Sequence, residues 1–404
     1  MAYTTIDDPS AFFQVLAYTG DSSSTTSADR SLTNIGNSDL QPDIVWIANR
    51  DTSVNSGLRW WDSSRGVGEN KGLTTSGTNL EGSPNDPEYG YVNTLSSDGF
   101  GVRAGANDGN GRWTVDRGEG GGDKYVAWQW KCSGGSVNNN TDGSITTSIQ
   151  TNSTAGITIG TYTGSSANSG YGTIGHGLGA IPDLVIIKGR DGNGQGGAAQ
   201  YWIVGAPNTA AFGNGGSKYM FLDTNAAIGT NTTMWYNTNF TTTTIPVGPH
   251  AAMNGNTAAY VFYAFKNIQG YSKIGQYKGT YTTTALNSSH ETTSPYNGPF
   301  IHTGFKPAWV MIKRTDSANN WCIFDNKRTK ISSTIREGNV LNEYLEADTT
   351  AAHKDYYYTG IDFLSNGFKV RGYDGTINAY GTYLYVAFAE NPFVTSTGIP
   401  TTAR

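Results

Sequence analysis

The chain contains little charge and almost no cysteine: 15% of its 404 residues are charged, and only two are cysteines. Its net charge of −5, without a basic stripe, argues against a nucleic-acid surface, which needs clustered Lys and Arg to displace counterions. Cys132 and Cys322 stand far apart at non-equivalent positions. A disulfide framework is therefore not expected, and both cysteines are predicted to be buried free thiols.

Segments that would target or anchor the chain are also lacking. Residues 1–14 have neither the basic region nor the apolar run of a secretory signal. No apolar stretch approaches the length of a membrane span. We therefore expect a soluble chain that carries no export signal of its own and does not insert into a membrane.

Catalytic and metal-binding signatures are equally scarce. The five histidines show no spacing that would place two ligands on one metal, and no G-x-S-x-G motif occurs. Residues 192–197 satisfy G-x-G-x-x-G, but residues 200–204 have the pattern of a strand, whereas a dinucleotide site needs a helix there. Residues 108–111 and 191–194 resemble calcium loops without the glutamate that completes an EF-hand. We expect no catalytic residue, no cofactor and no metal site.

What the chain has in abundance is glycine, with 53 residues, and aromatic side chains, with 12% of the total. This mixture is typical of a β-rich protein with many turns and disfavours helical bundles and disorder. A sustained 3.6-residue apolar period is missing. The one modest helical candidate is the segment of residues 333–347.

The sequence repeats one pattern three times, in blocks of roughly 120 to 140 residues. A strand is predicted to close each block, at residues 125–131, 260–266 and 383–389, because alternate positions there are wholly apolar. These positions are Val126, Trp128 and Trp130, then Val261, Tyr263 and Phe265, then Leu384, Val386 and Phe388. Such alternation predicts a strand with one face on a core.

A second strand lies nearer the start of each block and opens on a proline, at Pro42, Pro182 and Pro307. Proline is tolerated at the first residue of a strand, where its missing N–H does no harm. An aspartate follows nine residues later in each block, which indicates turn chemistry, because Asp accepts bonds from backbone N–H groups. These aspartates are Asp51, Asp191 and Asp316. Each block opens on Tyr-x-Gly, at residues 18–20, 162–164 and 277–279.

Blocks one and three share a further motif, in which an aspartate precedes an arginine by three residues. Asp62 and Arg65, like Asp325 and Arg328, are expected to form a local surface ion pair across a turn. Such a pair is worth about 0 to 1 kcal/mol. We therefore expect it to orient the turn rather than to stabilise the fold.

These observations predict an all-β protein of three tandem β-sandwich repeats, jelly-roll-like or lectin-like. We assign residues 1–132 to repeat 1 with a short N-terminal arm, 133–150 to a flexible Gly/Asn-rich linker, 151–269 to repeat 2, 270–393 to repeat 3 and 394–404 to a C-terminal arm, which could be extended. Only residues 267–270 separate the last strand of repeat 2 from repeat 3, so these two repeats are expected to dock rigidly.

The residues that carry the repeat also carry a resemblance. The motifs are Gln-Pro-Asp-Ile-Val-Trp-Ile at 41–47, Asp-Gly-Phe at 98–100, Tyr-Val-Ala-Trp-Gln-Trp-Lys at 125–131, Gly-His-Gly-Leu-Gly at 175–179, Gly-Phe-Lys-Pro-Ala-Trp-Val-Met-Ile-Lys at 304–313 and Ala-Phe-Ala-Glu-Asn-Pro-Phe at 387–393. Over residues 7–404 the chain resembles a family of uncharacterised-domain proteins abundant in marine bacteriophages. The resemblance implies a non-catalytic structural protein of the virion, synthesised in the cytoplasm of the bacterial host.

Three functions then compete. A capsid decoration or cement protein would bridge neighbouring capsomers, and the lack of coiled-coil heptads and collagen-like repeats favours it over a long fibre. A tail fibre, spike or adhesin would instead bind host surface glycans. An enzyme such as a depolymerase is the weakest alternative. The expected partners are other virion proteins of the capsid or tail. The chain is a monomer, a homotrimer, or one chain that imitates a threefold arrangement with its own repeats.

The candidate contact residues are aromatic. Neighbours on a strand point to opposite faces, so each aromatic cluster should place at least one ring away from the core. The candidates for contact with a glycan or a virion partner are Trp60, Trp113, Trp235, Tyr236 and Tyr357. The competing interpretation is that these rings pack between domains or against another virion protein.

Overall fold

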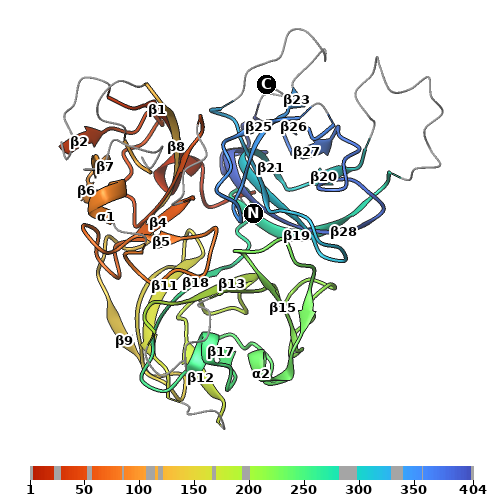
Figure 1. Cartoon of the computed structure of the whole chain (residues 1–404). Helices are drawn as coiled ribbons and strands as arrows, with labels where there is room; N and C mark the ends of the chain where they lie inside the picture. Colours follow the sequence, from red (N-terminus) through yellow and green to blue (C-terminus); the bar gives the residue numbers. More distant parts are fainter. Residues whose placement is uncertain are drawn as a thin grey trace.

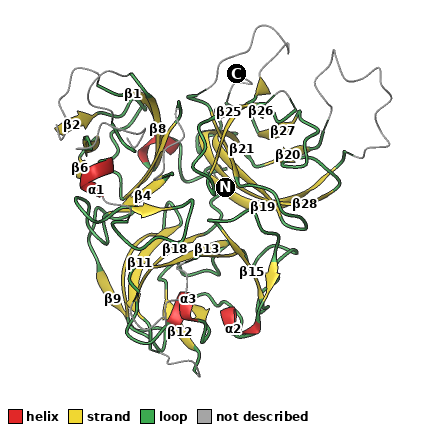
Figure 2. Cartoon of the chain, viewed as in Figure 1, coloured by secondary structure: helices red, strands yellow, loops and turns green. Residues whose placement is uncertain are grey.

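A computed structural model describes residues 3–21, 29–51, 57–83, 86–105, 114–116, 122–165, 170–192, 201–281, 298–328, 340–356 and 358–401. The predicted all-β class is confirmed, because antiparallel sheets make up nearly all of the regular structure (Figure 2). The helices of these residues are short: η1 Pro9–Ala11, α1 Asp86–Tyr89, α2 Thr232–Trp235 and α3 Ala251–Asn254. None of them is long and apolar enough to span a membrane.

Each repeat contains one large antiparallel sheet. In repeat 1 its order is β1 (Phe13–Thr19), β8 (Lys124–Trp130), β3 (Ile44–Asn49), β4 (Arg59–Asp62) and β5 (Leu73–Thr74). In repeat 2 it is β16 (Gly229–Thr230), β15 (Lys218–Phe221), β14 (Trp202–Gly205), β13 (Leu184–Gly189), β18 (Ala259–Phe265), β11 (Ile157–Thr163), β10 (Thr147–Asn152) and β9 (Asn138–Asn140). In repeat 3 it is β19 (Ser272–Gly279), β28 (Gly381–Pro392), β21 (Phe305–Arg314), β22 (Cys322–Asp325), β24 (Glu343–Glu346) and β25 (Lys354–Asp355).

The same strand order recurs in all three large sheets. The series β1-β8-β3-β4 of repeat 1 corresponds to β11-β18-β13-β14 and to β19-β28-β21-β22. The closing strand of each block therefore lies between the Tyr-x-Gly strand and the strand that follows the repeated proline, which is Pro42, Pro182 or Pro307. This correspondence, together with the strand registers, assigns equivalent residues in the three repeats.

A small sheet covers one face of each large sheet. These sheets are β2 (Asp29–Leu32), β7 (Gly99–Arg103) and β6 (Tyr91–Ser96); β12 (Gly172–Gly175) and β17 (Thr244–Val247); and β20 (Phe300–His302), β27 (Gly367–Val370), β26 (Ile361–Leu364) and β23 (Val340–Leu341). A separate apolar core lies between the two sheets of each repeat. Each repeat therefore has the two-layered form that the period-2 pattern predicts.

The other faces of the three large sheets meet in one shared apolar core, which we call the central core. Figure 1 shows the three repeats as lobes around this centre. Its aromatic members are Phe13, Trp46, Trp60, Trp128, Trp130, Trp202, Phe212, Tyr263, Phe265, Tyr271, Trp309, Trp321 and Phe388. Strands β3 and β13 are buried at every residue, because a small sheet covers one face and the central core covers the other.

The repeated aspartates and tyrosines all bond to backbone groups, but the aspartates do so between strands and not within the predicted turns. Each strand-end aspartate accepts a hydrogen bond from the backbone N–H that starts the neighbouring closing strand: Lys124 to Asp51 at 2.9 Å, Ala259 to Asp191 at 3.0 Å and Thr382 to Asp316 at 3.0 Å. The tyrosines of Tyr-x-Gly donate to backbone carbonyls: Tyr18 to Val115, Tyr162 to Met253 and Tyr277 to Ile377. Each aspartate thus joins two strands of one sheet, rather than closing a turn within a single segment.

Three expectations about the connecting segments are wrong. Residues 343–346 of the expected helix 333–347 form strand β24, and residues 329–339 lie outside the described part of the chain. The expected flexible linker 133–150 instead contributes strands β9 and β10 to the sheet of repeat 2. The C-terminal arm is not extended: Val394 pairs with Pro400, and Ser396 bonds to Asp7 of the N-terminal arm. Cys132 and Cys322 are buried free thiols, as predicted.

Candidate functional site

Three equivalent backbone hydrogen bonds join the repeats to one another. The amide of Glu81 donates to the carbonyl of Arg190, that of Ile228 to Thr315, and that of His353 to Arg50, each over 2.9 Å. Every acceptor immediately precedes a strand-end aspartate, so the three bonds occupy the same position in the three repeats. Repeat 1 thus contacts repeat 2, repeat 2 contacts repeat 3, and repeat 3 contacts repeat 1. This head-to-tail arrangement closes a ring, as a cyclic homotrimer would.

Indole side chains form hydrogen bonds across two of the same three contacts between repeats. Trp202 Nε1 of repeat 2 donates to the carbonyl of Thr74 in repeat 1, and Trp321 Nε1 of repeat 3 donates to Phe221 in repeat 2, both over 2.8 Å. At the third contact the equivalent residue is Leu58, which has no donor. Thr75 Oγ1 there bonds to the carbonyl of Ala347 at 3.0 Å. Each contact between repeats therefore contains a side-chain hydrogen bond to a backbone carbonyl of the neighbouring repeat.

Strand β8 and its equivalents also donate across the contacts. Tyr263 Oη donates to Asp62 Oδ2 over 2.6 Å, and Trp128 Nε1 donates to Asp325 Oδ2 over 3.0 Å. The register of the strands places Val386 and Ala206 at the third pair of positions. Both are apolar members of the central core. Where the donor is missing the acceptor is missing too, which avoids an unpaired buried carboxylate.

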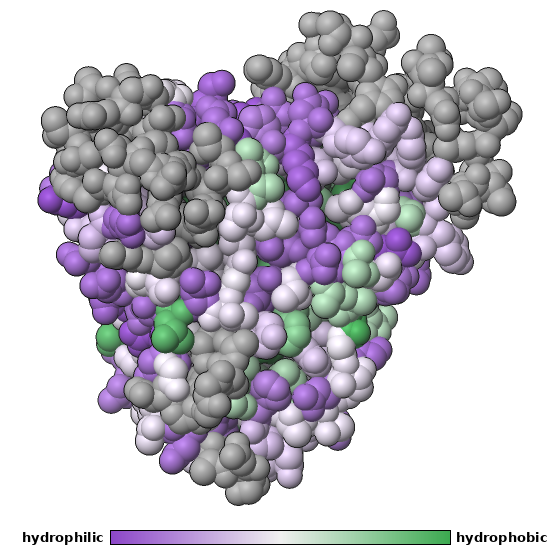
Figure 3. All heavy atoms as spheres, viewed as in Figure 1, coloured by the Kyte–Doolittle hydropathy of each residue, from purple (hydrophilic) through white to green (hydrophobic). Residues whose placement is uncertain are grey.

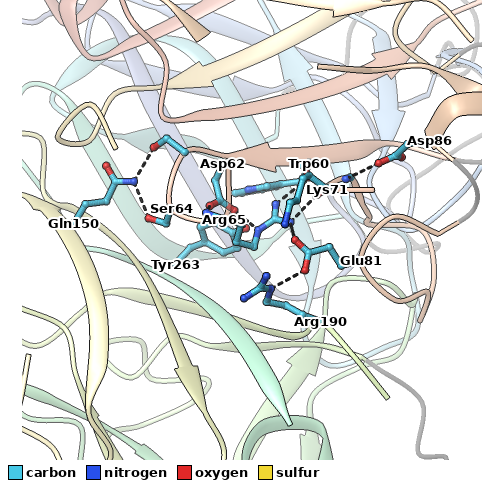
Figure 4. Close-up of polar contacts among 12 residues, drawn as sticks. Trp60, Asp62, Ser64, Arg65, Lys71, Glu81, Asp86, Gln150, Arg190 and Tyr263 are labelled. Carbon is cyan, nitrogen blue, oxygen red and sulfur yellow. Dashed lines mark hydrogen bonds and ion pairs between the residues drawn. The ribbon is translucent and has the colours of Figure 1, made fainter. Parts of the chain in front are cut away.

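The aspartate–arginine pairs are buried, so the expectation of surface ion pairs is wrong. Asp62 Oδ2 lies 2.6 Å from Arg65 Nε with both side chains 0% exposed, and Asp325 Oδ2 lies 2.5 Å from Arg328 Nε. Figure 4 shows that Arg65 also forms an ion pair with Glu81, and that Glu81 forms a second one with Arg190 of repeat 2. The neighbouring repeat covers these side chains. A motif that looks local in sequence therefore forms part of the contact between repeats.

Two lysine–aspartate pairs occupy equivalent positions of repeats 2 and 3; Lys188, Lys313 and Asp223 are buried, and Asp348 is partly buried. Asp223 accepts a bond from the amide of Trp202, and Asp348 accepts one from the amide of Trp321. Burial lowers the pKa of Lys188 and raises that of Asp223, its neighbour. Burial likewise lowers the pKa of Lys313 to about 8 and raises that of Asp348 to about 6. Burial thus disfavours the charged forms of all four side chains. Their protonation therefore makes the stability of the fold depend on pH.

The structure separates the five predicted contact aromatics. Trp60 is only 2% exposed in the central core, and Trp235 is 1% exposed in the core of repeat 2, so neither offers a surface ring. Trp60 and its neighbour Trp61 are both buried because strand β4 is covered on both faces. Trp113 and Tyr357 lie outside the described residues. Of the five, Tyr236 is described at the surface.

Tyr236 belongs to an exposed pair that sequence reasoning did not find. It stacks on Tyr171 with ring centroids 4.9 Å apart and planes 9° apart, and the two residues are 43% and 53% exposed. Tyr236 ends helix α2 in the left-handed region, with φ 55°. Residues other than glycine rarely adopt this backbone conformation, which here ends the helix. The two tyrosines are 65 residues apart in sequence, so no local pattern indicates the pair.

A second group of tyrosines lies in repeat 3, beside the predicted Tyr357. Tyr356 contacts Tyr358, which contacts Tyr373, which in turn contacts Tyr281, with ring centroids 4.5 to 5.4 Å apart. Tyr356 is 44% exposed. Such rings offer flat, partly apolar surfaces with hydroxyl groups at their edges, which suit contact with a sugar or a protein.

The comparisons with known proteins identify one family. A family model described as Domain of unknown function (DUF7483) matches residues 8–392. No curated protein and no solved structure matches the chain.

Proposed function

Because the chain belongs to the DUF7483 family, for which no activity is described, we propose its function from its own architecture: a non-catalytic structural protein exposed on the surface of a bacteriophage virion. The resemblance in the repeat motifs supports the virion assignment. The observation that carries the structural role is the ring of three equivalent 2.9 Å bonds between the repeats. It makes one chain into a body with three similar lobes held at fixed angles.

The most favoured form of this role is a capsid decoration or cement protein. Three lobes about one centre can contact several neighbouring subunits at once, and linked contacts raise the effective concentration of each one. A shared core of large aromatic side chains lets the body resist separation of the lobes. Figure 3 shows hydrophobic residues as small patches within a mainly hydrophilic face, which fits a body that docks over part of its surface.

A tail fibre, spike or adhesin is the second candidate, and the exposed Tyr171–Tyr236 pair favours it. A sugar ring can stack on the outer face of either tyrosine, because the pair itself covers only the inner faces. The backbone strain at Tyr236 supports a function for its position.

Immunogold labelling of intact virions with an antibody to this chain tests both candidates. Labels over the head are the result expected for decoration. Labels restricted to the tail would support the adhesin. Tyr236→Ala should then reduce host adsorption, while the control Tyr380→Ala, at a tyrosine that is 74% exposed in repeat 3, should not. Purified virions that contain the chain in neither place would contradict the proposal.

A further inference from the structure

The three contacts of the ring differ in one respect. The chain itself runs from repeat 1 to repeat 2 and from repeat 2 to repeat 3, but no covalent connection joins repeat 3 to repeat 1. We call this third contact the seam. The N-terminal arm holds it together: Tyr3 Oη bonds to the carbonyl of Gly304 at 2.9 Å, and Asp7 accepts the amide of Ser396 at 2.6 Å.

At the first connection, a glutamine side chain fills the groove between the repeats. Gln150, on strand β10 of repeat 2, donates from Nε2 to Ser63 Oγ and Ser64 Oγ of repeat 1, each over 2.7 Å (Figure 4). Its Oε1 accepts the amides of Ser133 and Gly135 at 3.2 Å. The primary amide therefore uses both its donor and its acceptor in this groove.

An aspartate secures the same place in the chain. Asp43 accepts the amides of Cys132 and Gly134 at 2.6 and 3.0 Å, where the chain leaves repeat 1. Asp183 accepts the amide of Asn267 at 2.6 Å, where the chain leaves repeat 2. The equivalent residue in repeat 3 is Ala308, because Asn326 bonds to its carbonyl just as Ser63 bonds to that of Asp43. Alanine has no carboxylate, so it cannot accept amides as Asp43 and Asp183 do.

The equivalent groove at the seam is open. A cavity of about 160 Å³ lies there, and its walls include the residues that correspond to the closed groove of the first connection. These are Ala308 for Asp43, Asn326 and Lys327 for Ser63 and Ser64, and Glu390 and Asn391 for Cys132 and Ser133. One water needs about 10 to 15 Å³, so the cavity has room for a side chain.

The walls of this cavity suit a primary amide. Asn326 Oδ1 is buried and has no hydrogen-bond partner among the described residues, so it lacks a donor. Lys327, which is exposed at the same wall, offers N–H donors. Phe13 and Val15 supply apolar walls, and Ile35, 65% exposed, lies at the rim. A bound segment would thus meet a donor, an acceptor and apolar side chains together.

We propose that the seam cavity binds an extended peptide segment of a neighbouring protein through a Gln or Asn side chain, as Gln150 fills the equivalent groove within the chain. When the Asn326 side chain turns toward the cavity that it lines, the amide N–H₂ of the ligand donates to Asn326 Oδ1, and the ligand oxygen accepts from Lys327 Nζ. In a virion the segment belongs to an adjacent structural protein. That statement rests on the proposed function, whereas the binding chemistry does not.

The test uses the full chain and a peptide with the sequence of residues 147–152, Thr-Ser-Ile-Gln-Thr-Asn, blocked at both ends. Saturation-transfer NMR with peptide concentrations up to about 10 mM should show saturable binding. Replacing Gln by Ala in the peptide should weaken it about tenfold. Asn326→Ala and Lys327→Ala should each weaken it at least about threefold. Lys124→Ala, at an exposed lysine outside the cavity, is the matched control and should leave binding unchanged.

Two results would overturn the inference: no saturable binding, or binding that Asn326→Ala and Lys327→Ala leave unchanged. Asn326 and Lys327 lie after strand β22 rather than within a core, and thermal unfolding of each variant checks its fold. If the chain binds the peptide but the antibody labels no virion, the seam site stands and the virion function is rejected. The two failures are therefore distinguishable.

Discussion

At the scale of single residues, buried polar groups define the contacts between repeats. Tyr263 and Trp128 each donate to a carboxylate of the neighbouring repeat, and the third equivalent position holds Val386 opposite Ala206. A buried carboxylate without partners costs several kcal/mol, so donor and acceptor must occur together or not at all. The contacts are therefore specific as well as apolar.

Arg65 should contribute far more to stability than a surface ion pair does. Arg65→Ala removes the guanidinium from Asp62 and Glu81, leaving Asp62 buried with only the Tyr263 hydroxyl as a side-chain partner, and should lower the free energy of unfolding by about 3 to 5 kcal/mol. The matched control is Arg103→Ala, because the Arg103 and Asp29 side chains are 39% and 58% exposed and their pair is worth about 0 to 1 kcal/mol. Urea unfolding measures both. Equal losses in the two variants would show that the Arg65 pair acts as a surface pair.

Asp348 should make stability fall as pH rises. Burial raises its pKa from 3.8 to about 6, so its contribution is complete below about pH 4 and is lost as the pH rises through 6. Asp348→Asn keeps an oxygen for the amide of Trp321 but cannot ionise. The variant should match the unchanged chain near pH 4 and exceed its stability near pH 7 by roughly 1 to 3 kcal/mol. The electrostatic partners of this carboxyl include Lys313, which favours its ionised form, and Glu346, which opposes it.

Urea unfolding at several pH values between about 4 and 7 measures this difference. Asp39→Asn, at an exposed carboxylate, is the control and should not reproduce the gain in stability near pH 7. A parallel pH dependence of Asp348→Asn and the unchanged chain would reject the assignment.

At the scale of elements, the predicted strands occur where the period-2 pattern placed them, because their alternation reflects one face on a core. The closing strands β8, β18 and β28 cover the predicted residues within a few positions. The connections were predicted less well. Residues 133–150 look like a flexible linker because they are polar and rich in glycine, yet Asp43 and Gln150 bond to backbone amides in this segment. Asp43 lies 91 residues before Gly134 in the chain, so the composition of the segment does not indicate this contact.

Asp43 should therefore order the connection between repeats 1 and 2. Asp43→Ala removes the acceptor of the Cys132, Gly134 and Gly135 amides and should cost roughly 2 to 4 kcal/mol. Amide hydrogen exchange at Gly134 and Gly135 should rise by at least about tenfold more than in the core strands. Asp98→Ala, which removes one 3.2 Å bond to the amide of Leu40, is the control and should leave this segment protected. Unchanged exchange at Gly134 and Gly135 would show that other contacts order the connection.

At the scale of the whole molecule, the ring makes the three repeats depend on one another. Each large sheet lends one face to the central core, so a repeat on its own would expose the aromatic side chains that this core buries. In repeat 2 these include Trp202, Tyr263 and Phe265. Burial of such side chains is worth about 1.5 to 3 kcal/mol each, a large fraction of the stability of a domain.

The full chain should consequently unfold in one cooperative transition. Differential scanning calorimetry should give a calorimetric enthalpy close to the van't Hoff enthalpy. A fragment of residues 151–269 should fail to fold as a soluble monomer, whereas a protein of independent domains would give soluble fragments. Three separable transitions, or a stable monomeric fragment, would contradict the shared core.

The β class, the strand positions and the buried free thiols could all be predicted from the amino-acid sequence. These features depend on each residue's own chemistry and on the periodicity of its near neighbours. Which strands are buried on both faces depends instead on how the three repeats pack together. The sequence predicted a surface ring at Trp60, but the ring of Tyr263 in repeat 2 lies 4.7 Å from it. The sequence also predicted that Asp62 and Arg65 are exposed, but the same repeat covers them. Burial results from contacts between residues far apart in the chain, and a local pattern cannot report them.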